Sequence, residues 1–386
     1  MDPLNETLPV NLGPDVKPMI LRVRDLDMYV LHAGQRSAPL LLLLHGFPEL
    51  SYSWRHLLVP LSELGFFVVA PDQRGYGRTH NITSDEQLVE YWDDLAPYRM
   101  LSLVHDIVAL VHALGYDQAA AVVGHDFGSS VAAHCALTRP DMFKALVCMS
   151  APYAGQPRYP TVLDTSHTPV PPKTTPWTAL GDLLAGLHPP MKHYTAYFSG
   201  PDANADMVNT PQGLQAFLRA YFHMKSADWP GNDPHPLKDV TQILRLPHYY
   251  VMPAHQTMPA AVLAHAPSEL EVAKNRWLPD EELAVYVETF RRTGFQGGLN
   301  WYRAMRDLSS VDELGVFAGK KIKVPSMFLG GVKDWGIYQG PGVLEKMETV
   351  CTQYKGTVLI DGAGHWVQQE QPREVVKTLT KFLQQT

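Results

Sequence analysis

The stretch Ala119-Ala-Ala-Val-Val-Gly-His-Asp-Phe-Gly128 gives the strongest indication of the fold. An apolar run typical of a strand opens it, and small, apolar residues typical of a buried helix follow it. Gly124 and Gly128 lie two positions before and two positions after Asp126. Because a Cβ atom at either glycine would crowd so sharp a turn, we predict a strand–turn–helix unit that presents the Asp126 side chain. The alternative is that Asp126 only caps the helix.

Strand and helix patterns alternate on both sides of this turn. Strands are predicted at residues 19–23, 28–32, 40–44, 66–70, 119–123, 145–149, 322–329 and 357–360. Helices are predicted at residues 52–64, 99–114 and 372–383, and a glycine ends each of the first two. Several of the strands are continuous apolar runs, which indicates burial on both faces. The order predicts an α/β fold with a mostly parallel central sheet and helices on both faces.

The alternation stops in the middle of the chain. Prolines are frequent from about residue 152 to residue 190, as in Thr168-Pro-Val-Pro-Pro172, and aromatic-rich helices are predicted at residues 212–225 and 280–292. We therefore expect residues 155–308 to form an inserted helical cap domain with irregular loops. The core would then consist of two parts, residues 1–154 and residues 309–386.

Composition excludes several classes of function. The formal net charge is −7 with no long run of one sign, which argues against binding to nucleic acid or to an anionic membrane surface. No apolar stretch reaches the roughly 20 residues that span a bilayer. Three cysteines cannot form a full disulfide set, and the first residues contain no secretory signal pattern. We therefore expect a cytoplasmic protein.

Reactive side chains follow three of the predicted strands. Asp126 follows the strand in the decisive stretch, Asp334 follows strand 322–329, and His365 follows strand 357–360. Because reactive groups gather at the carboxyl ends of parallel strands, these three are expected to meet. A nucleophile, an acid and a histidine in this chain order form a hydrolase triad. The alternative for Asp334 is a helix cap, with Asp307 or Asp312 as the acid.

Other polar residues near these strand ends are expected to be structural. His45 and His125 are expected to support the loops of the site, and Asp72 and Arg74 to form an ion pair. The remaining central histidines lack the spacing of metal ligands, so we expect no metal site. They are His235, His248, His255 and His265.

The chain resembles the soluble epoxide hydrolases of the α/β-hydrolase superfamily over nearly its whole length after residue 17. The shared motifs in the core are His45-Gly-Phe-Pro, Asp72-Gln-Arg-Gly-Tyr-Gly, Gly124-His-Asp-Phe-Gly and Gly364-His-Trp. This resemblance implies the α/β-hydrolase fold.

Two segments of the expected cap extend the resemblance. Gly294-Phe-Gln-Gly-Gly-Leu-Asn-Trp-Tyr-Arg303 is similar to the family segment that holds one catalytic tyrosine, here Tyr302. His193-Tyr-Thr-Ala-Tyr-Phe198 is similar to the segment that holds the other, here Tyr194, with Tyr197 as an alternative. Either tyrosine could instead be a packed aromatic residue of a cap helix.

The resemblance implies a two-step reaction without a cofactor. An aspartate is already anionic near neutral pH, so Asp126 can attack an epoxide carbon and form an alkyl-enzyme ester. Tyr194 and Tyr302 would donate hydrogen bonds to the epoxide oxygen. His365, oriented by Asp334, would then take a proton from the water that cleaves the ester, leaving a vicinal diol.

The same resemblance assigns the surroundings of the nucleophile. The backbone N–H groups of Phe47 and Phe127 would form the oxyanion hole, and the Phe47–Pro48 peptide bond is expected to be cis. The substrate-binding residues would be Phe47, Pro48, Phe127, Trp301 and Trp366.

One departure from the family concerns the residue after the nucleophile. Phe127 stands where a tryptophan is common, which weighs against a haloalkane dehalogenase-like hydrolase, because that activity resembles one that grips halide with an indole N–H. Two further alternatives remain, an epoxide-opening cyclase and a catalytically inactive ligand-binding homologue. The cap is longer than usual, which suggests a lipophilic epoxide as the substrate. Water is the expected second reactant. A homodimer is left open.

Overall fold

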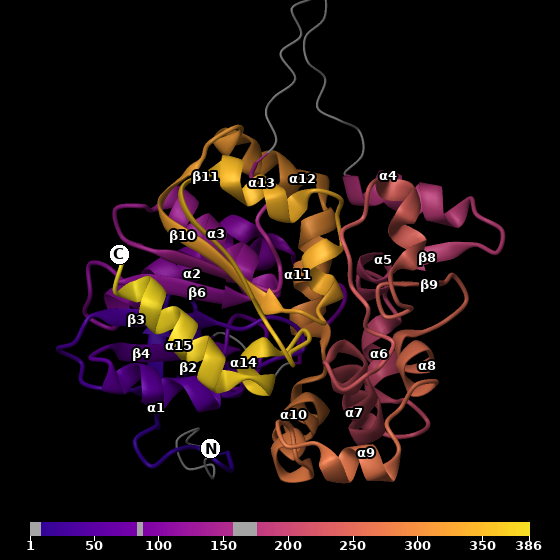
Figure 1. The fold of residues 1–386 in the computed structure, drawn as a ribbon, viewed down its shortest axis with the longest axis horizontal. Helices are drawn as coiled ribbons and strands as arrows, with labels where there is room; N and C mark the ends of the chain where they lie inside the picture. Colours follow the sequence, from indigo (N-terminus) through magenta and orange to yellow (C-terminus); the bar gives the residue numbers. More distant parts are fainter. Residues whose placement is uncertain (1–8, 83–87, 157–175) are drawn as a thin grey trace, which may run out of the picture.

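Figure 1 shows the computed structural model of the protein, which describes residues 9–82, 88–156 and 176–386. Within these residues one nine-stranded sheet forms the core, in the order β1-β2-β4-β3-β6-β7-β10-β11, with β5 paired to β2. The strands are β1 (Lys17–Val23), β2 (Leu26–Ala33), β3 (Leu40–Leu44), β4 (Phe67–Pro71), β5 (His80–Asn81), β6 (Ala121–His125), β7 (Leu146–Met149), β10 (Ile322–Gly331) and β11 (Cys351–Ile360).

The sheet is antiparallel at one end and parallel in the rest. β1, β2, β4 and β5 are joined by antiparallel pairings, and all pairings from β4 through β3, β6, β7 and β10 to β11 are parallel. Leu44 pairs with Gly124 and His125 pairs with Met149, so the central strands end at one level. Polar residues that follow these strands are thereby brought to the same edge of the sheet.

Two hydrophobic layers cover the two faces of this sheet. Side chains alternate along a strand, so the five leucines of β3 divide between them: Leu40, Leu42 and Leu44 belong to one buried cluster, and Leu41 and Leu43 to the other. The first layer includes helices α2 (Met100–Ala113) and α3 (Phe127–Thr138). The second includes α1 (Arg55–Glu63) and α15 (Pro372–Leu383). The prediction of strands buried on both faces is therefore confirmed.

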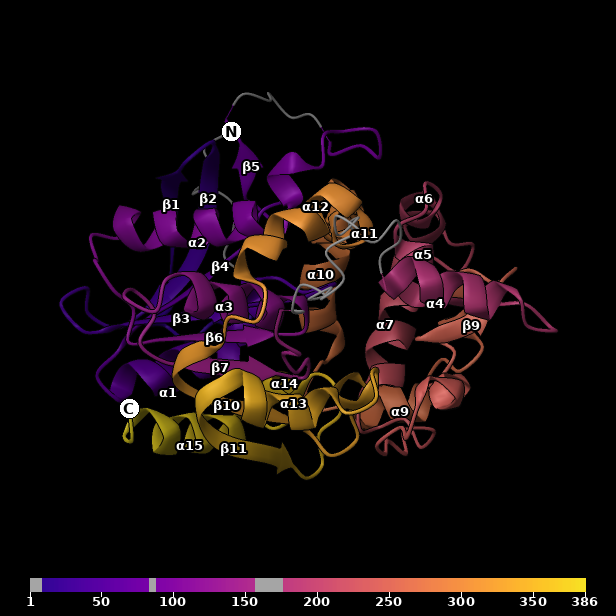
Figure 2. The same cartoon turned by 90° about the horizontal axis from the view of Figure 1, so that it is seen from above.

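Between β7 and β10 the described chain is mainly helical and lies at one side of the sheet (Figures 1 and 2). Its helices are α4 (Pro176–Ala185), α5 (Tyr194–Phe198), α6 (Ala203–Val208), α7 (Leu214–Lys225), α8 (Met258–Leu263), α9 (Glu269–Lys274), α10 (Asp280–Thr293), α11 (Gln296–Arg306) and α12 (Leu308–Glu313). A two-stranded antiparallel sheet, β8 (Met191–His193) with β9 (Val251–Pro253), was not expected from the sequence. Its strands are too short to show an alternating pattern.

Short elements complete the core and the helical region between β7 and β10. They are α13 (Val343–Val350), α14 (Val367–Glu370) and the 3₁₀ helices Ser51–Trp54, Ala96–Tyr98, Val240–Arg245, Leu314–Phe317 and Trp335–Tyr338. The expected proline-rich run at residues 168–172 lies outside the described residues. In the parts of the chain that the structure describes, no helix is both long and apolar enough to cross a membrane. Cys135, Cys148 and Cys351 are all buried free thiols.

Candidate active site

Asp126 stands alone between the end of β6 and the first residue of α3. Its backbone has φ 53° and ψ −121°, a conformation that non-glycine residues rarely adopt. Its side chain makes no capping hydrogen bond to the helix, which rules out the alternative of a simple cap. Instead Oδ1 accepts a hydrogen bond from the backbone N–H of Phe47 at 3.0 Å. The turn therefore aims the carboxylate away from its own helix and across to the loop after β3.

Both glycines of the turn are required by close backbone contacts. A Cβ atom on Gly124 would lie 2.1 Å from the carbonyl oxygen of Gly128, and one on Gly128 would lie 2.3 Å from that of Leu44. The crowding predicted from the sequence is therefore confirmed. The same holds for the facing loop, where a Cβ atom on Gly46 would lie 2.4 Å from Oδ1 of Asp126. The glycines at positions 46, 124 and 128 thus allow the turn at Asp126 and the opposite loop to touch.

Asp126, His365 and Asp334 lie together, as their chain order predicts. Nε2 of His365 is 3.3 Å from Oδ2 of Asp126, and Nδ1 of His365 is 3.1 Å from Oδ1 of Asp334. Asp334 also accepts the N–H of Gly336 at 2.6 Å, so it caps a 3₁₀ helix and faces the imidazole at the same time. The alternative acids do not fit, because Asp307 caps α12 through Ser310 and Asp312 is exposed.

The imidazole is close to Asp126 but not aligned with it. Nε2 of His365 is buried and has no hydrogen-bond partner of acceptable angle among the described residues, although the carboxylate is only 3.3 Å away. A histidine that is hydrogen-bonded on one nitrogen and left free on the other can accept a proton from a third molecule.

Both carboxylates of the triad remain ionised despite burial. Burial raises the pKa of Asp126, but the adjacent His365 and the charge of Lys225 outweigh it and leave the pKa well below its ordinary value. The same balance lowers the pKa of Asp334, where the N–H of Gly336 adds to His365 and Lys225. Asp126 is therefore an anion throughout the physiological pH range.

Two phenols from separate helices lie close enough to Asp126 to be affected by its charge. Tyr302 lies on α11 and Tyr194 is the first residue of α5, with ring centroids 5.9 Å apart and planes at 76°. Burial, together with the negative charge of Asp126, raises the pKa of both hydroxyl groups. Each phenol therefore keeps its proton near neutral pH and can act as a hydrogen-bond donor.

The alternative residue Tyr197 points elsewhere. Its hydroxyl donates to Oδ2 of Asp206 at 2.9 Å, and the ammonium group of Lys192 lies over its ring at 5.0 Å. Since a phenol has a single proton to donate, the hydroxyl of Tyr197 is engaged by Asp206, and the geometry favours Tyr194.

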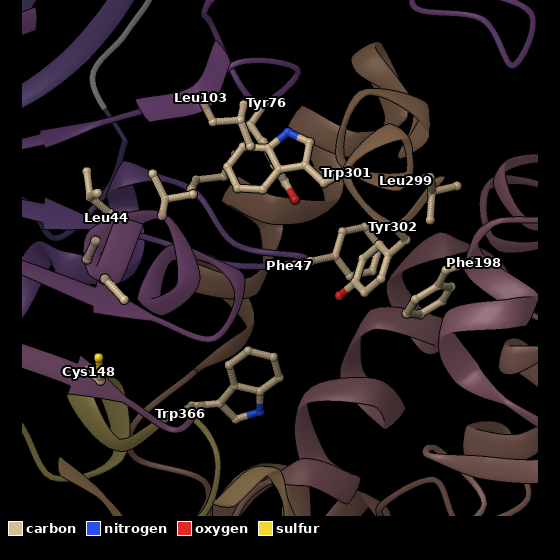
Figure 3. Packing of buried hydrophobic residues seen from close by; sticks show 14 of the residues in the cluster. Leu44, Phe47, Tyr76, Leu103, Cys148, Phe198, Leu299, Trp301, Tyr302 and Trp366 are labelled. Atoms are coloured by element: carbon tan, nitrogen blue, oxygen red, sulfur yellow. The ribbon is translucent and has the colours of Figure 1, made fainter. Parts of the chain in front are cut away.

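Aromatic rings surround the phenols. Figure 3 shows the Tyr302 ring beside Phe47 and Phe198, with centroid distances of 5.5 and 5.1 Å, and those two rings also contact each other at 5.0 Å. The ring of Phe127 meets Tyr302 edge-on at 5.2 Å. The Phe47–Pro48 bond is cis, as predicted, and Pro48 is buried.

The two tryptophans expected to bind substrate lie on different sides of the site and are both fully buried. The indole N–H of Trp301 donates to the carbonyl of Arg74, and its ring packs behind Phe127 at 5.2 Å. The indole N–H of Trp366 donates to the carbonyl of Phe222 on α7. Both N–H groups are therefore engaged by the protein itself.

A buried pair of side chains, His125 and Glu49, supports the loop that holds His365. Nδ1 of His125 lies 2.5 Å from Glu49, and its Nε2 lies 2.7 Å from the carbonyl of His365. Burial lowers the pKa of His125, but the charge of Glu49 outweighs burial and raises it. His125 and His45, which accepts the N–H of Gln73, therefore support loops, as the sequence predicts. Glu49 was not singled out, although it closes the segment that follows the strand at 40–44.

One structural prediction is wrong. Arg74 does not pair with Asp72 but with Asp25 at 2.6 Å and Asp106 at 2.7 Å. Asp72 is turned onto the backbone, where it accepts the N–H groups of Ser51 and Arg78. The glycine-rich turn after Asp72 brings the N–H of Arg78 to its carboxylate, and the N–H of Ser51 comes from the segment after β3. The partners of Arg74 come from other distant segments.

The sequence also gave no role to Lys225 and Glu370. The backbone N–H of His365 donates to the carbonyl of Lys225 at 2.8 Å. Glu370 accepts N–H groups from Gly364 and Trp366, which flank the histidine, and from Ala227. The end of α7 and the histidine loop are thus tied together. No group of three or more histidine, cysteine or acidic side chains in the described ranges could hold a metal ion.

Comparisons with known proteins identify the fold and the family of the chain. Residues 39–196 match the alpha/beta hydrolase fold family. The chain is 33% identical over 365 residues to epoxide hydrolase A of Mycobacterium tuberculosis, covering 92% of this chain and 93% of that protein. The chain belongs to the epoxide hydrolase family. Epoxide hydrolase 2 of Siraitia grosvenorii is 30% identical over 93% of this chain and 95% of its own length.

Solved structures of epoxide hydrolases share the fold. Epoxide hydrolase I of potato, Solanum tuberosum, superposes with a TM-score of 0.71 and 28% identity, covering 96% of this chain and all of that chain. Epoxide hydrolase A of Mycobacterium thermoresistibile gives a TM-score of 0.73 and 30% identity, with coverage of 96% and 98%. Fold class and family therefore agree with the prediction from the sequence: an epoxide hydrolase with the alpha/beta hydrolase fold.

Proposed function

We propose that this epoxide hydrolase opens its substrate to a vicinal diol in two steps, through a covalent ester on Asp126. One observation carries the proposal. A buried, ionised carboxylate lies 3.3 Å from an imidazole on one side and is close enough to two phenols for its charge to raise the pKa of both. Nucleophile, base and acids therefore converge on one point, as displacement at an epoxide carbon requires.

In the first step an oxygen of Asp126 attacks an epoxide carbon and the carbon–oxygen bond of the ring breaks. The leaving oxygen would be a strongly basic alkoxide, so it needs a proton or a hydrogen bond as it forms. Tyr194 and Tyr302 are placed to donate both, because their hydroxyl groups remain protonated. The negative charge thereby moves from Asp126 to the epoxide oxygen, and when one phenol transfers its proton to that oxygen the charge passes to the phenolate.

In the second step His365 takes a proton from water, and the hydroxide attacks the ester carbonyl of Asp126. The carbonyl oxygen becomes an oxyanion, which the N–H groups of Phe47 and Phe127 would stabilise. The first already donates to Oδ1 in the resting site, and the second belongs to the first turn of α3, whose N–H groups lack helical partners. Each such donor contributes about 3 kcal/mol to transition-state stabilisation. The tetrahedral intermediate then collapses: the bond between the carbonyl carbon and the diol oxygen breaks, Asp126 is released as a carboxylate, and the two protons of the water restore the diol hydroxyl group and the phenol. Asp334 balances the charge on the imidazolium while that charge is present.

Residues 155–308 are proposed to form the cap that carries Tyr194 and Tyr302 over the core of residues 1–154 and 309–386. The rings of Phe47, Phe127 and Phe198 around Tyr302 favour a lipophilic epoxide. Trp301 and Trp366 would contribute to this wall through their ring faces, since their N–H groups are engaged.

Oxygen-18 labelling tests the covalent step. In a single turnover of styrene oxide in oxygen-18 water, we expect an unlabelled diol and one labelled oxygen on the Asp126 peptide, because the diol takes its new oxygen from the carboxylate. Mass spectrometry measures the oxygen-18 content of the diol and of the Asp126 peptide. A diol labelled in the first turnover would show direct attack by water and would refute the ester.

Three further assays separate the alternatives. Halide release from a haloalkane panel would indicate a dehalogenase, a cyclic ether from a hydroxy-epoxide would indicate a cyclase, and tight binding without turnover would indicate an inactive homologue. The proposal requires none of these three outcomes and a vicinal diol as the product of an epoxide.

Removal of either phenol oxygen is expected to slow ester formation. Tyr302→Phe and Tyr194→Phe each lose one donor to the epoxide oxygen and should reduce the rate of the first step by roughly 10²-fold. Tyr197→Phe is the matched control on the same helix as Tyr194, and it should react at the native rate because its hydroxyl serves Asp206. Rapid-quench measurement of the ester gives the rate. A larger loss in Tyr197→Phe than in Tyr194→Phe would exchange the two assignments.

We further propose that the enzyme is cytoplasmic, and the homodimer stays open. The three free buried cysteines support a reducing compartment. Cell fractionation tests the location, and light scattering of the purified chain tests the dimer.

A further inference from the structure

Lys225, the last residue of α7, has its side chain buried beside the active site. Only 3% of the residue is exposed. A buried ammonium group is costly unless it is paired, and most buried lysines pair with a carboxylate. In the described part of the chain, no carboxylate lies within salt-bridge distance of Lys225. Its charge must therefore be stabilised in another way.

Three aromatic rings take the place of an ion-pair partner. Nζ of Lys225 lies 5.4 Å from the ring centroid of Tyr221, 5.1 Å from that of Tyr250 and 5.3 Å from that of Trp366. The three rings are themselves fully buried. Cation–π attraction is strongest where the cation is desolvated, so the cage holds the ammonium group at one place without neutralising it.

The field of this cation reaches the reacting carboxylates. The charge of Lys225 helps to lower the pKa of Asp126 and of Asp334. The carboxylates act on Lys225 as well. Burial lowers the pKa of Lys225, and the negative charges of Asp126, Asp334 and Glu49 oppose that shift. The cage thus places one uncompensated positive charge close to a cluster of three buried carboxylates.

The backbone around Lys225 fixes this arrangement. Its carbonyl accepts the N–H of His365 at 2.8 Å, and a Cβ atom on Gly364 would lie 2.6 Å from the same oxygen. Glu370 joins the two segments by accepting the N–H groups of Ala227 and Gly364 at 2.8 and 2.9 Å. Displacement of Lys225 would therefore displace the histidine loop as well.

A fixed positive charge acts differently on the two steps of the reaction. Negative charge leaves Asp126 when the ester forms, and returns to it as an oxyanion when water attacks the ester. A nearby cation therefore stabilises the starting state of the first step and the transition state of the second. Its net effect is to favour hydrolysis of the ester over its formation.

We propose that Lys225 is a positioning residue of this enzyme: its carbonyl orients the His365 loop, and its caged ammonium group promotes hydrolysis of the Asp126 ester. This inference rests on the proposed two-step function. It predicts a change in the ratio of the two rates, which a purely structural role would not produce.

Lys225→Met, which removes the charge and keeps the length, tests the inference. Hydrolysis of the ester should slow about tenfold, the effect expected of one buried charge near the reacting atom, while ester formation with styrene oxide should not slow. The ester should therefore accumulate in the steady state, as measured by rapid quench and intact mass. Lys225→Arg, which keeps a cation over the rings, should restore near-native accumulation.

Lys192→Met is the matched control. Lys192 also lies over a tyrosine ring, that of Tyr197 at 5.0 Å, but it faces Asp206 and not the triad. Its loss should leave both rates native. If Lys225→Met does not fold by circular dichroism, Lys225→Gln is measured in the same way.

The possible failures are distinguishable. Equal slowing of both steps, or no change in ester accumulation, in a folded Lys225 variant would overturn the inference and leave the mechanism intact. Absence of any ester on Asp126 in the native enzyme would overturn the mechanism and the inference together.

Discussion

Asp126→Ala is expected to lower the turnover of styrene oxide by at least about 10⁴-fold, a loss typical of a removed nucleophile. Among the residues that the structure describes, no other carboxylate beside His365 could replace Asp126, because Asp334 is turned to the opposite nitrogen of His365 and Glu49 is bound to His125. Diol formation followed by chromatography gives the rate. Circular dichroism should show a native fold, since the methyl group of alanine takes up less space in the elbow.

Asp141→Ala is the control for this substitution. Asp141 is 62% exposed and pairs only with Arg139 at the surface, so its loss should leave turnover native. If Asp126→Ala retained more than about one per cent of native turnover, direct hydration of the epoxide would have to replace the covalent mechanism.

His365→Gln is expected to stop the reaction half-way. Asp126 can still attack the epoxide, but without an imidazole no group takes the proton of water, and turnover should fall by about 10³- to 10⁴-fold. The enzyme should then gain the mass of one substrate molecule on the Asp126 peptide. Intact-mass spectrometry after mixing with styrene oxide, followed by digestion, locates the adduct.

His112→Gln is the corresponding control, because His112 is an exposed residue in the last turn of α2. It should neither accumulate an adduct nor lose turnover. An inactive His365→Gln enzyme without an adduct would mean that His365 is needed before or during attack by Asp126. The roles of the two residues would then need to be reassigned.

The sizes of the expected substitution effects follow from where each residue lies in the structure. The nucleophile stands on a backbone turn with φ 53°, held by glycine contacts that leave no freedom, whereas the two phenols come from α5 and α11 outside the sheet. Variants at Asp126 and His365 remove the attacking group or the group that takes the proton of water, variants at the phenols remove one of two hydrogen-bond donors, and variants at Lys225 change the field that acts on Asp126. This difference is why Asp126 and His365 carry the largest expected losses.

The sequence by itself determined the sheet and the elbow, because both depend on local spacing. A run such as Leu40–Leu44 can be buried on both faces only in a covered sheet, and the glycines on either side of Asp126 mark a turn that no Cβ atom fits. Chain order at the strand ends then placed Asp334 and His365 beside Asp126, since parallel strands bring their carboxyl ends to one edge.

The tertiary structure alone decided which side chains pair across long distances in the chain. It binds the hydroxyl of Tyr197 to Asp206, which favours Tyr194 as the proposed donor, and it pairs Arg74 with Asp25 and Asp106. The aromatic cage of Lys225 is of the same kind, because its rings come from a helix, a loop of the insertion and the histidine loop. Spacing along a strand or helix says which face a residue occupies. Which distant residue meets it there depends on how whole elements pack, and that information is spread over the entire chain.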